Sequence, residues 1–235
     1  MGAGRGAVPS RVSFSPMIDK QVASIAAALD GIRDGATILS AGFGGVGAPD
    51  ELLDGLLEQG VRDLVVVSNN AGRGKRGLAA LIDAGFVRKV ICSFPRTDDP
   101  RAFDAAYKAG RIELELVPQG IISERMRCAA AGLGGFYSPV GVGTQLADGK
   151  EVREIDGKRY VFEKPLRGDV ALLRAQRADR WGNLAFRKSA RNFNPIMAMA
   201  AELTVVQAKE LVALGDIDPE CVHTPGIFVD RLVIV

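Results

Sequence analysis

Short apolar segments alternate with segments of helical periodicity along most of this chain. In chain order, the first half predicts a helix over 18–29, a strand over 36–39, a helix over 49–59, a strand over 63–68, a helix over 78–84, a strand over 87–94, a helix over 99–109, a strand over 111–117 and a helix over 120–131. Strands that alternate with helices through short loops pair in parallel, and the helices cover both faces of the sheet. The sequence therefore predicts the α/β class with a largely parallel sheet.

This alternation is interrupted between residues 132 and 186. Asp156-Gly157 between two β-prone arms predicts a hairpin turn, so we expect a small β-rich excursion in this region. The alternation then resumes, with strands expected over 169–175, 203–208 and 227–235 and a helix over 194–201. No internal repeat or long linker interrupts residues 17–235, which we expect to form a single domain. Residues 1–16 contain two arginines, three serines and no acid, and we expect them to form a flexible N-terminal extension.

The charge balance narrows the range of partners. The chain has 30 lysine and arginine residues against 28 aspartates and glutamates, a net charge of +2. Such near-balance gives no electrostatic reason to expect binding to nucleic acid or to an anionic membrane. No apolar run approaches the length of a membrane span. We therefore expect no nucleic-acid partner and no membrane partner.

Cysteine and histidine are scarce and scattered. Cys92, Cys128 and Cys221 are widely spaced and form no C-x-x-C pair. This argues against a disulfide framework and against a structural zinc site, and it suits a reducing cytoplasm. His223 is the only histidine, so a histidine-based triad would have to use it. We expect a cytoplasmic protein with no metal site, and core thiols at Cys92 and Cys128.

A glycine-rich loop, SAGFGGVGAPDELL (40–53), joins the first predicted strand to the next helix. Loops at the carboxyl ends of parallel strands bind ligands in α/β folds, and bare amides at a helix N-terminus favour an anion. A P-loop is excluded because no lysine occurs between Lys20 and Lys75. The spacing from Gly42 to Gly47 matches the dinucleotide pattern G-x-G-x-x-G, but Asp63 starts the following strand instead of ending it. Binding of a dinucleotide and a purely turn-forming role for the glycines both stay open on this motif alone.

A longer pattern around this loop is more specific. Residues 34–49 read D-G-x-x-x-x-x-x-G-F-x-x-x-G-x-P, which resembles the signature of the first, or A, subunit of the family I CoA-transferases. The likeness continues in order through VSNNAG (67–72), ELELVPQG (113–120), GLGGFYSPVGVGT (132–144), GKEVREIDGKRYVFEKPLRGD (149–169), ADRWGNL (178–184), RKSARNFNP (187–195) and TPGIFVDRLV (224–233). These blocks cover essentially all of residues 17–235, and they imply a CoA-transferase-like fold.

The resemblance also implies an activity. Enzymes of this family move CoA from an acyl-CoA donor to a free carboxylic acid through a covalent glutamyl-CoA intermediate, without a metal or an organic cofactor. The nucleophilic glutamate belongs to the B subunit, in a Ser-Glu-Asn-Gly type of motif that this chain lacks. Glu124 in ISERMR is the nearest imitation, and its spacing is typical of a solvated helix face. We therefore expect an A subunit that is catalytic only with its B partner.

Some blocks point to a subgroup of the family. SNNAG, ICSFPR and ADRWGNL look most like the members that transfer CoA from succinyl-CoA to the 3-oxo acid 3-oxoadipate. Members that act on acetoacetate share RNFNP and are the first alternative. A stand-alone acyl-CoA-binding α/β domain without catalysis is the second, because a fold alone does not fix an activity.

The resemblance assigns roles to particular residues. Gln119 in VPQG is implied to donate a hydrogen bond to the oxyanion that forms from the thioester, although a glutamine can also merely close the turn. The implied CoA-binding loop consists of Ala41, Gly42, Phe43, Gly44, Gly45, Val46 and Gly47. The family usually has Gly-Gly-Phe here, and the methyl group of Ala41 restricts the backbone and could crowd a ligand. Asn69 and Asn70 could line the substrate pocket or form a turn.

Two further groups of polar residues have alternative interpretations. Arg73, Lys75 and Arg76 could meet the carboxylates of a dicarboxylic substrate or the phosphates of CoA, or they could form a solvated basic loop. Ser189, Arg191 and Asn194 could line a pocket or anchor a loop.

Overall fold

The computed structural model describes residues 18–235. The flexible extension predicted over residues 1–16 lies outside the described residues, and the single domain over 17–235 stays a prediction.

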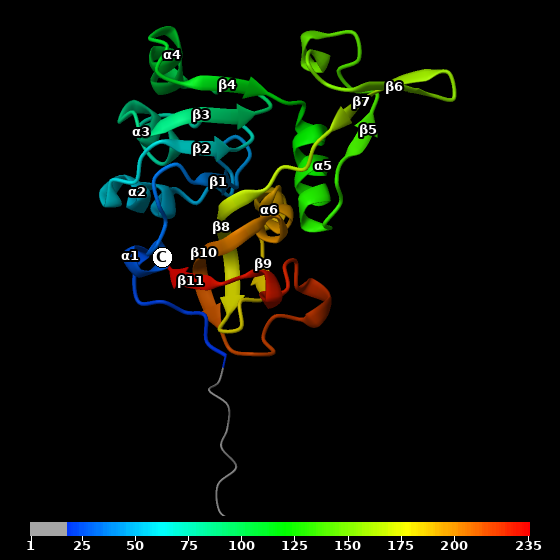
Figure 1. Cartoon of the computed structure of the whole chain (residues 1–235). Coiled ribbons are helices and arrows are strands. Elements are labelled where there is room, and N and C mark those ends of the chain that lie inside the picture. The colour runs from blue at the N-terminus through cyan, green and yellow to red at the C-terminus, as the bar shows by residue number, and fades with distance from the viewer. Residues whose placement is uncertain (1–17) are drawn as a thin grey trace, which may run out of the picture.

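A large parallel sheet forms the centre of the molecule (Figure 1). Its strand order is β11-β10-β8-β1-β2-β3-β4, and every pair of neighbours in that order is parallel. The eighth strand, β9, pairs antiparallel with β8. The strands are β1 (Thr37–Ser40), β2 (Leu64–Val67), β3 (Val87–Cys92), β4 (Glu113–Leu116), β8 (Gly168–Asp179), β9 (Leu184–Ala185), β10 (Ala201–Val212) and β11 (Arg231–Ile234). The predicted α/β class with a largely parallel sheet is confirmed.

Helices cover both faces of this sheet, as predicted. Consecutive strand residues point to opposite faces, so Ile38 belongs to the buried cluster on one side and Leu39 to the cluster on the other. One face carries α1 (Ile25–Ala28), α2 (Asp50–Gln59), α3 (Leu78–Asp83) and α4 (Arg101–Lys108); the other carries α5 (Gln119–Ala130) and α6 (Asn194–Ala200). Leu52 and Leu56 of α2 are fully buried, and burial of each such side chain stabilises the fold by roughly 1.5–3 kcal/mol.

The predicted β-rich excursion is a separate three-stranded antiparallel sheet of order β5-β7-β6. Its strands are β5 (Phe136–Ser138), β6 (Val152–Ile155) and β7 (Lys158–Glu163). Asp156 and Gly157 both have positive φ, 50° and 74°, which is the backbone of the tight two-residue hairpin that the sequence predicts. In Figure 1 this small sheet projects beyond α5, away from the large sheet. Short 3₁₀ turns occupy Gln145–Ala147, Lys188–Arg191, Pro219–Cys221 and Gly226–Phe228.

Two predicted elements at the ends of the described chain are wrong in extent. The helix expected over 18–29 is reduced to α1, whose N-terminus is capped by the Ser24 hydroxyl. Residues before it run beside β11 instead: the Val22 N–H donates to the Leu232 carbonyl and the Leu232 N–H donates to the Lys20 carbonyl, both at 2.8 Å. Pairing with an exposed strand edge therefore outweighs the helical periodicity. The last strand begins only at Arg231 because a 3₁₀ turn occupies Gly226–Phe228.

The order of the strands fixes where a ligand can bind. From β1 the chain adds β2, β3 and β4 on one side, whereas β8, β10 and β11 lie on the other side. The sheet therefore has its topological switch point between β1 and β8, and in such sheets ligands bind at the carboxyl ends of the strands near that point. The glycine-rich loop leaves the carboxyl end of β1 at this switch point.

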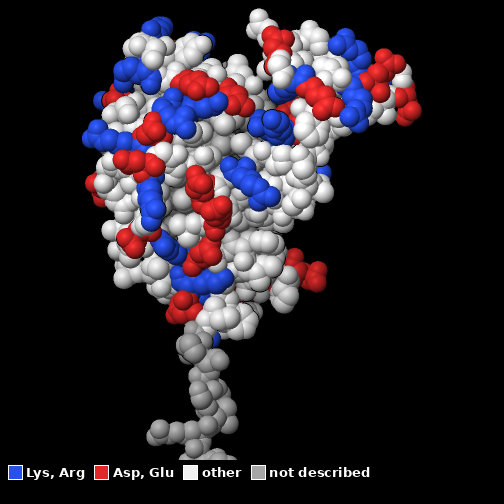
Figure 2. Space-filling model, in the orientation of Figure 1, with Lys and Arg blue, Asp and Glu red and all other residues white. Residues whose placement is uncertain are grey.

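Charged side chains are mixed over the surface. On the face seen in Figure 2, lysine and arginine alternate with aspartate and glutamate over both the main body and the small sheet. Among the described residues, no helix is long and apolar enough to cross a membrane.

Candidate functional site

The loops that follow β1, β2, β3 and β4 meet at one edge of the sheet and enclose two neighbouring cavities. The amide cavity, of about 570 Å³, is lined by Phe43, Gly44, Asn69, Asn70, Arg73, Ser93, Phe94, Arg96, Thr97, Asp98 and Gln119. The loop cavity, of about 340 Å³, lies beside it and is lined by the start of the glycine loop, by Asp50 and by residues 68–78 after β2. Asn70 and Arg73 line both. The structure thus brings most of the predicted site residues together.

The glycine loop is a tight hairpin. Phe43 and Val46 exchange two backbone hydrogen bonds of 3.0 Å, and Gly44 and Gly45 between them have φ values of 57° and 86°. Both values lie in the left-handed region that residues with a side chain avoid. Phe43 and Val46 are about half exposed at the tip of the loop. The glycines therefore form a turn that presents two apolar side chains at the edge of the site.

Asn192 fixes the glycine loop to the rest of the molecule. Its side-chain oxygen accepts from the Gly42 N–H at 3.2 Å, and its side-chain nitrogen donates to the Val46 carbonyl at 3.0 Å. Asn194 is fully buried and holds the turn around Asn192, because its side chain donates to the Ala190 carbonyl at 2.9 Å. The RNFNP segment thus anchors the glycine loop through Asn192, and Asn194 supports that segment from within. Asn192 was not predicted as a site residue from the sequence, although it lies inside the RNFNP block that carried part of the family resemblance.

At Gly47 the glycine loop packs closely against Ala190 and Asn192 of the RNFNP region. A Cβ atom at Gly47 would lie 2.7 Å from the Ala190 carbonyl oxygen, which is closer than side-chain carbons approach backbone oxygens. At Gly44, by contrast, a Cβ atom would meet nothing within 4 Å. Ser189 lies on the other side of the loop, in a third cavity at the switch point that Gly47 also lines.

At the N-terminus of α2, a side chain from another strand already accepts from a backbone amide. The Leu52 N–H donates to the Gln207 side-chain oxygen at 3.1 Å, and the Gln207 nitrogen donates to Glu51. The carboxyl of Asp50 has a raised pKa, first because it is partly buried and second because Glu51 is adjacent. The Leu52 amide is therefore not free to bind an anion, and anion binding at this helix start stays a prediction. Binding of CoA by the loop itself stays a prediction.

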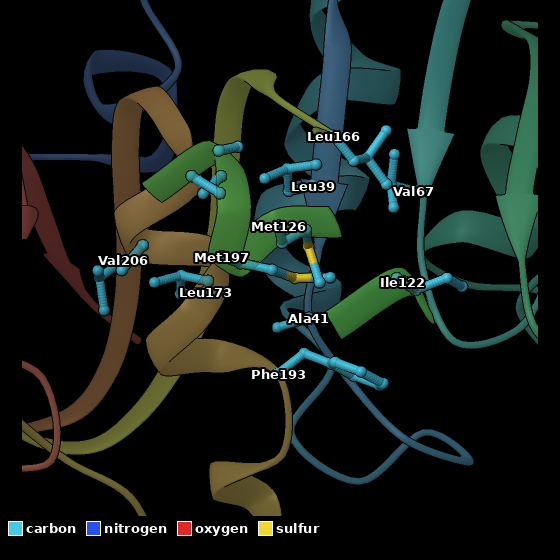
Figure 3. Close-up of a cluster of buried hydrophobic side chains, with 14 of the residues drawn as sticks. Leu39, Ala41, Val67, Ile122, Met126, Leu166, Leu173, Phe193, Met197 and Val206 are labelled. Atoms are coloured by element: carbon cyan, nitrogen blue, oxygen red, sulfur yellow. The ribbon is translucent and has the colours of Figure 1, made fainter. Parts of the chain in front are cut away.

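Ala41 belongs to the core as much as to the site. It is only 2% exposed and is part of the buried cluster under α5 and α6 (Figure 3), while it also lines the loop cavity. Its φ is not positive, so the backbone at this position does not require glycine. The methyl group that distinguishes this chain from the usual family pattern is therefore accommodated by packing.

Gln119 lies at the wall of the amide cavity as the first residue of α5. Its side-chain oxygen faces the Asn69 nitrogen at 3.5 Å, and Asn69 also donates to the Ser93 hydroxyl at 2.9 Å. Ser93 in turn donates to the Asn69 carbonyl at 3.0 Å. Since Asn69 holds the oxygen of Gln119, the N–H groups of the Gln119 amide are left to donate to a ligand, and residues 18–235 supply no acceptor for them.

Asn69 and Asn70 differ in role. Asn69 is 6% exposed and orients Gln119. Asn70 accepts from the Gly72 N–H at 2.9 Å, which is the turn-forming arrangement typical of asparagine, and it also lines both cavities. The turn-forming role of Asn70 is thus confirmed, and its role in a substrate pocket stays a prediction.

Other reactive side chains are engaged elsewhere. Burial raises the pKa of the Cys92 thiol to about 12, so Cys92 is a core thiol, and Cys128 is fully buried as well. His223 accepts from the Phe186 N–H at 2.9 Å, and burial and Arg191 lower its pKa. Glu124 pairs with Arg127 at 2.7 Å on an exposed face of α5. None of these groups lines the amide cavity.

Comparison with solved structures identifies the fold. An acyl-CoA transferase from Escherichia coli O157:H7 matches with a TM-score of 0.81 at 24% sequence identity, over 97% of this chain and 48% of that chain. The chain therefore has the CoA-transferase fold, and it spans about half the length of that solved protein.

Comparison of sequences is more specific. The family described as Coenzyme A transferase matches residues 22–234, so this chain belongs to the coenzyme A transferase family. The A subunit of the 3-oxoadipate CoA-transferase of Pseudomonas putida is 58% identical over 93% of this chain and 95% of its own length. The A subunit of the succinyl-CoA:3-ketoacid coenzyme A transferase of Xanthomonas campestris pv. campestris is 49% identical over 92% of this chain and 88% of its own length.

Proposed function

We propose that this chain is the A subunit of a heteromeric CoA-transferase that moves CoA from succinyl-CoA to a 3-oxo acid, namely 3-oxoadipate. The observation that carries the proposal is the 58% identity, over nearly the whole chain, to a relative named as the A subunit of a 3-oxoadipate CoA-transferase. The geometry agrees, because an amide donor and a glycine loop line one open cavity at the carboxyl ends of β1 to β4.

The chemistry requires a carboxylate nucleophile. The glutamate carboxylate attacks the thioester carbonyl, the CoA thiolate leaves, and an acyl-glutamyl anhydride forms. The thiolate then attacks the glutamyl carbonyl of the anhydride, which releases the first acid and leaves a glutamyl-CoA thioester. The second acid reverses these steps and departs as its CoA ester. No glutamate lines the amide cavity or the loop cavity among residues 18–235, which supports a nucleophile supplied by a B subunit.

Gln119 is suited to the charge that develops in each step. When the carboxylate adds to the thioester, the carbonyl oxygen becomes negative and needs donors that are already aimed at it. Gln119 lines the open cavity, and the contact from Asn69 to its oxygen leaves its N–H groups without an acceptor among residues 18–235. In this proposal Gln119 donates to the oxyanion, and Asn69 with Ser93 holds it in place.

The exposed rim of the cavity supports a partner that covers it. Phe43 is 47% exposed and Phe94 is 65% exposed, and both rings line the amide cavity. Exposed aromatic side chains are typical of surfaces that another protein buries. A B subunit docked here would exclude water from the thioester and complete the site.

The proposal also covers cofactors and cellular location. The glutamate and the CoA thiol supply both nucleophiles, so the reaction needs no metal and no organic cofactor. We place the protein in the cytoplasm, with the free thiols Cys92, Cys128 and Cys221 as support.

Mixing experiments test the proposal. The purified chain is combined with the B subunit of a 3-oxoadipate CoA-transferase, and acyl-CoA species are separated by chromatography after addition of succinyl-CoA and an acid. We expect exchange in the mixture and none with either chain alone, with 3-oxoadipate as the preferred acceptor. Exchange with acetoacetate in preference to 3-oxoadipate would assign the other acid. Failure to form any complex would contradict the half-enzyme, and tight binding of CoA esters without turnover would favour a binding domain.

A further inference from the structure

We propose that Arg73 binds the distal carboxylate of a dicarboxylic substrate in the amide cavity, and so selects dicarboxylic over monocarboxylic acids. The inference rests on the function proposed above.

Arg73 lies at the junction of the two cavities. It is the only charged residue, among those that the structure describes, that lines both the amide cavity and the loop cavity. Its side chain packs on the glycine loop, since a Cβ atom at Gly45 would lie 3.4 Å from the Arg73 Nε atom. Because Gly45 has no side chain, the Arg73 guanidinium can lie against the glycine loop. The loop therefore positions this cation in addition to forming a turn.

The neighbouring arginines are more firmly paired. Arg76 makes two contacts with Asp54, at 2.7 and 3.1 Å, and Arg96 contacts Asp104 at 2.9 Å. Arg73 has a single long contact of 3.5 Å with Asp98, and both of these side chains are more than half exposed. Such an exposed ion pair is weak, so Arg73 can turn from Asp98 to an incoming carboxylate. Lys75 lines the loop cavity but not the amide cavity.

The lining of the amide cavity combines amide, cationic and apolar groups. Gln119 and Asn69 provide the amide wall where the thioester carbonyl reacts, and Arg73 is a separate cationic point on the lining. The exposed rings of Phe43 and Phe94 offer apolar contact for the methylene groups between. Succinate and 3-oxoadipate each carry a second carboxylate. Asp98 also lines the cavity and would repel this carboxylate, so a cation is needed to bind it there. A guanidinium meets a carboxylate with two parallel hydrogen bonds, so its geometry as well as its charge contributes.

The test compares two acceptor acids on one CoA-loaded enzyme. The reconstituted complex is loaded from acetoacetyl-CoA, whose acyl group has no second carboxylate, and discharge of CoA to 3-oxoadipate and to acetoacetate is then measured. The variants are Arg73→Gln and Arg73→Lys. Arg101→Gln is the matched control, since it removes the same charge from an exposed pair with Asp99 at 2.7 Å and lines neither cavity.

We expect Arg73→Gln to lower kcat/KM for 3-oxoadipate about 10- to 100-fold and to leave acetoacetate within about two-fold. Arg73→Lys keeps the charge but not the two-point contact, and we expect an intermediate loss. Equal losses for both acids, no loss for 3-oxoadipate, or the same loss in Arg101→Gln would overturn the inference. If the unmodified complex takes no CoA from any ester, the proposed function itself fails and the inference falls with it.

Discussion

Replacement of Gln119 by alanine is expected to lower kcat of the reconstituted enzyme about 10²- to 10³-fold, which is the effect of removing one oxyanion donor. The transition state gains negative charge at the thioester oxygen, and an alanine offers it no hydrogen bond. The same change should alter the free energy of unfolding by less than about 0.5 kcal/mol, because the Gln119 side chain is exposed and its one contact, with Asn69, is 3.5 Å long. Steady-state kinetics and denaturant unfolding of the same preparation separate the two effects.

Gln119→Glu sharpens this prediction. Glutamate keeps the size of the side chain but replaces the donor with a carboxylate, which would repel the developing oxyanion, so we expect a loss at least as large as with alanine. Gln145→Ala is the control, because Gln145 is an exposed glutamine in the 3₁₀ turn between β5 and β6 of the small sheet. A loss of less than about five-fold in Gln119→Ala would remove Gln119 from the oxyanion site, since a true donor contributes far more.

The second large effect is expected at Gly47. Gly44→Ala and Gly47→Ala both place a side chain at positive φ, which costs about 1–2 kcal/mol in each case. Only Gly47→Ala also forces a Cβ atom against the Ala190 oxygen, and overpacking of this kind costs a further ~1–3 kcal/mol. The loop would have to leave its contacts with Asn192, so the walls of both cavities would shift.

We therefore expect Gly47→Ala to lose about 10²-fold in kcat/KM, since a displacement of about 1 Å in a positioning element has this effect, whereas Gly44→Ala loses much less. Denaturant unfolding of each variant gives the stability difference, and kinetics of the reconstituted complexes give the difference in activity. Equal losses of stability in the two variants would mean that the loop is not held against the RNFNP segment in the way that Asn192 and Ala190 indicate.

The convergence of Phe43, Asn69 and Gln119 could be predicted from the sequence for a simple reason. Each follows a strand of a parallel sheet, and the carboxyl ends of parallel strands lie at one edge. The period of the apolar residues was enough to find those strands. The resemblance to a known family then supplied the role of Gln119, which the pattern alone left open between a donor and a turn.

Contacts between distant segments could not be predicted in this way. The hydrogen bond from Gly42 to Asn192 joins residues 150 positions apart, and the Gln207 cap on Leu52 joins residues 155 apart. No local periodicity signals which asparagine or glutamine will meet a given amide. The same holds for Val22, whose pairing with Leu232 replaced a predicted helix. These contacts depend on the tertiary fold, and they are the ones that set the position of the loop.

The central claim is that this chain supplies the oxyanion donor and that its partner carries the covalent CoA. Intact-mass spectrometry of the two separated subunits, after brief incubation of the complex with succinyl-CoA, tests it most directly. We predict that the partner gains the mass of one CoA as a glutamyl thioester and that this chain keeps its own mass. A CoA adduct on this chain, at Glu124 or any other residue, with an unmodified partner, would contradict the account.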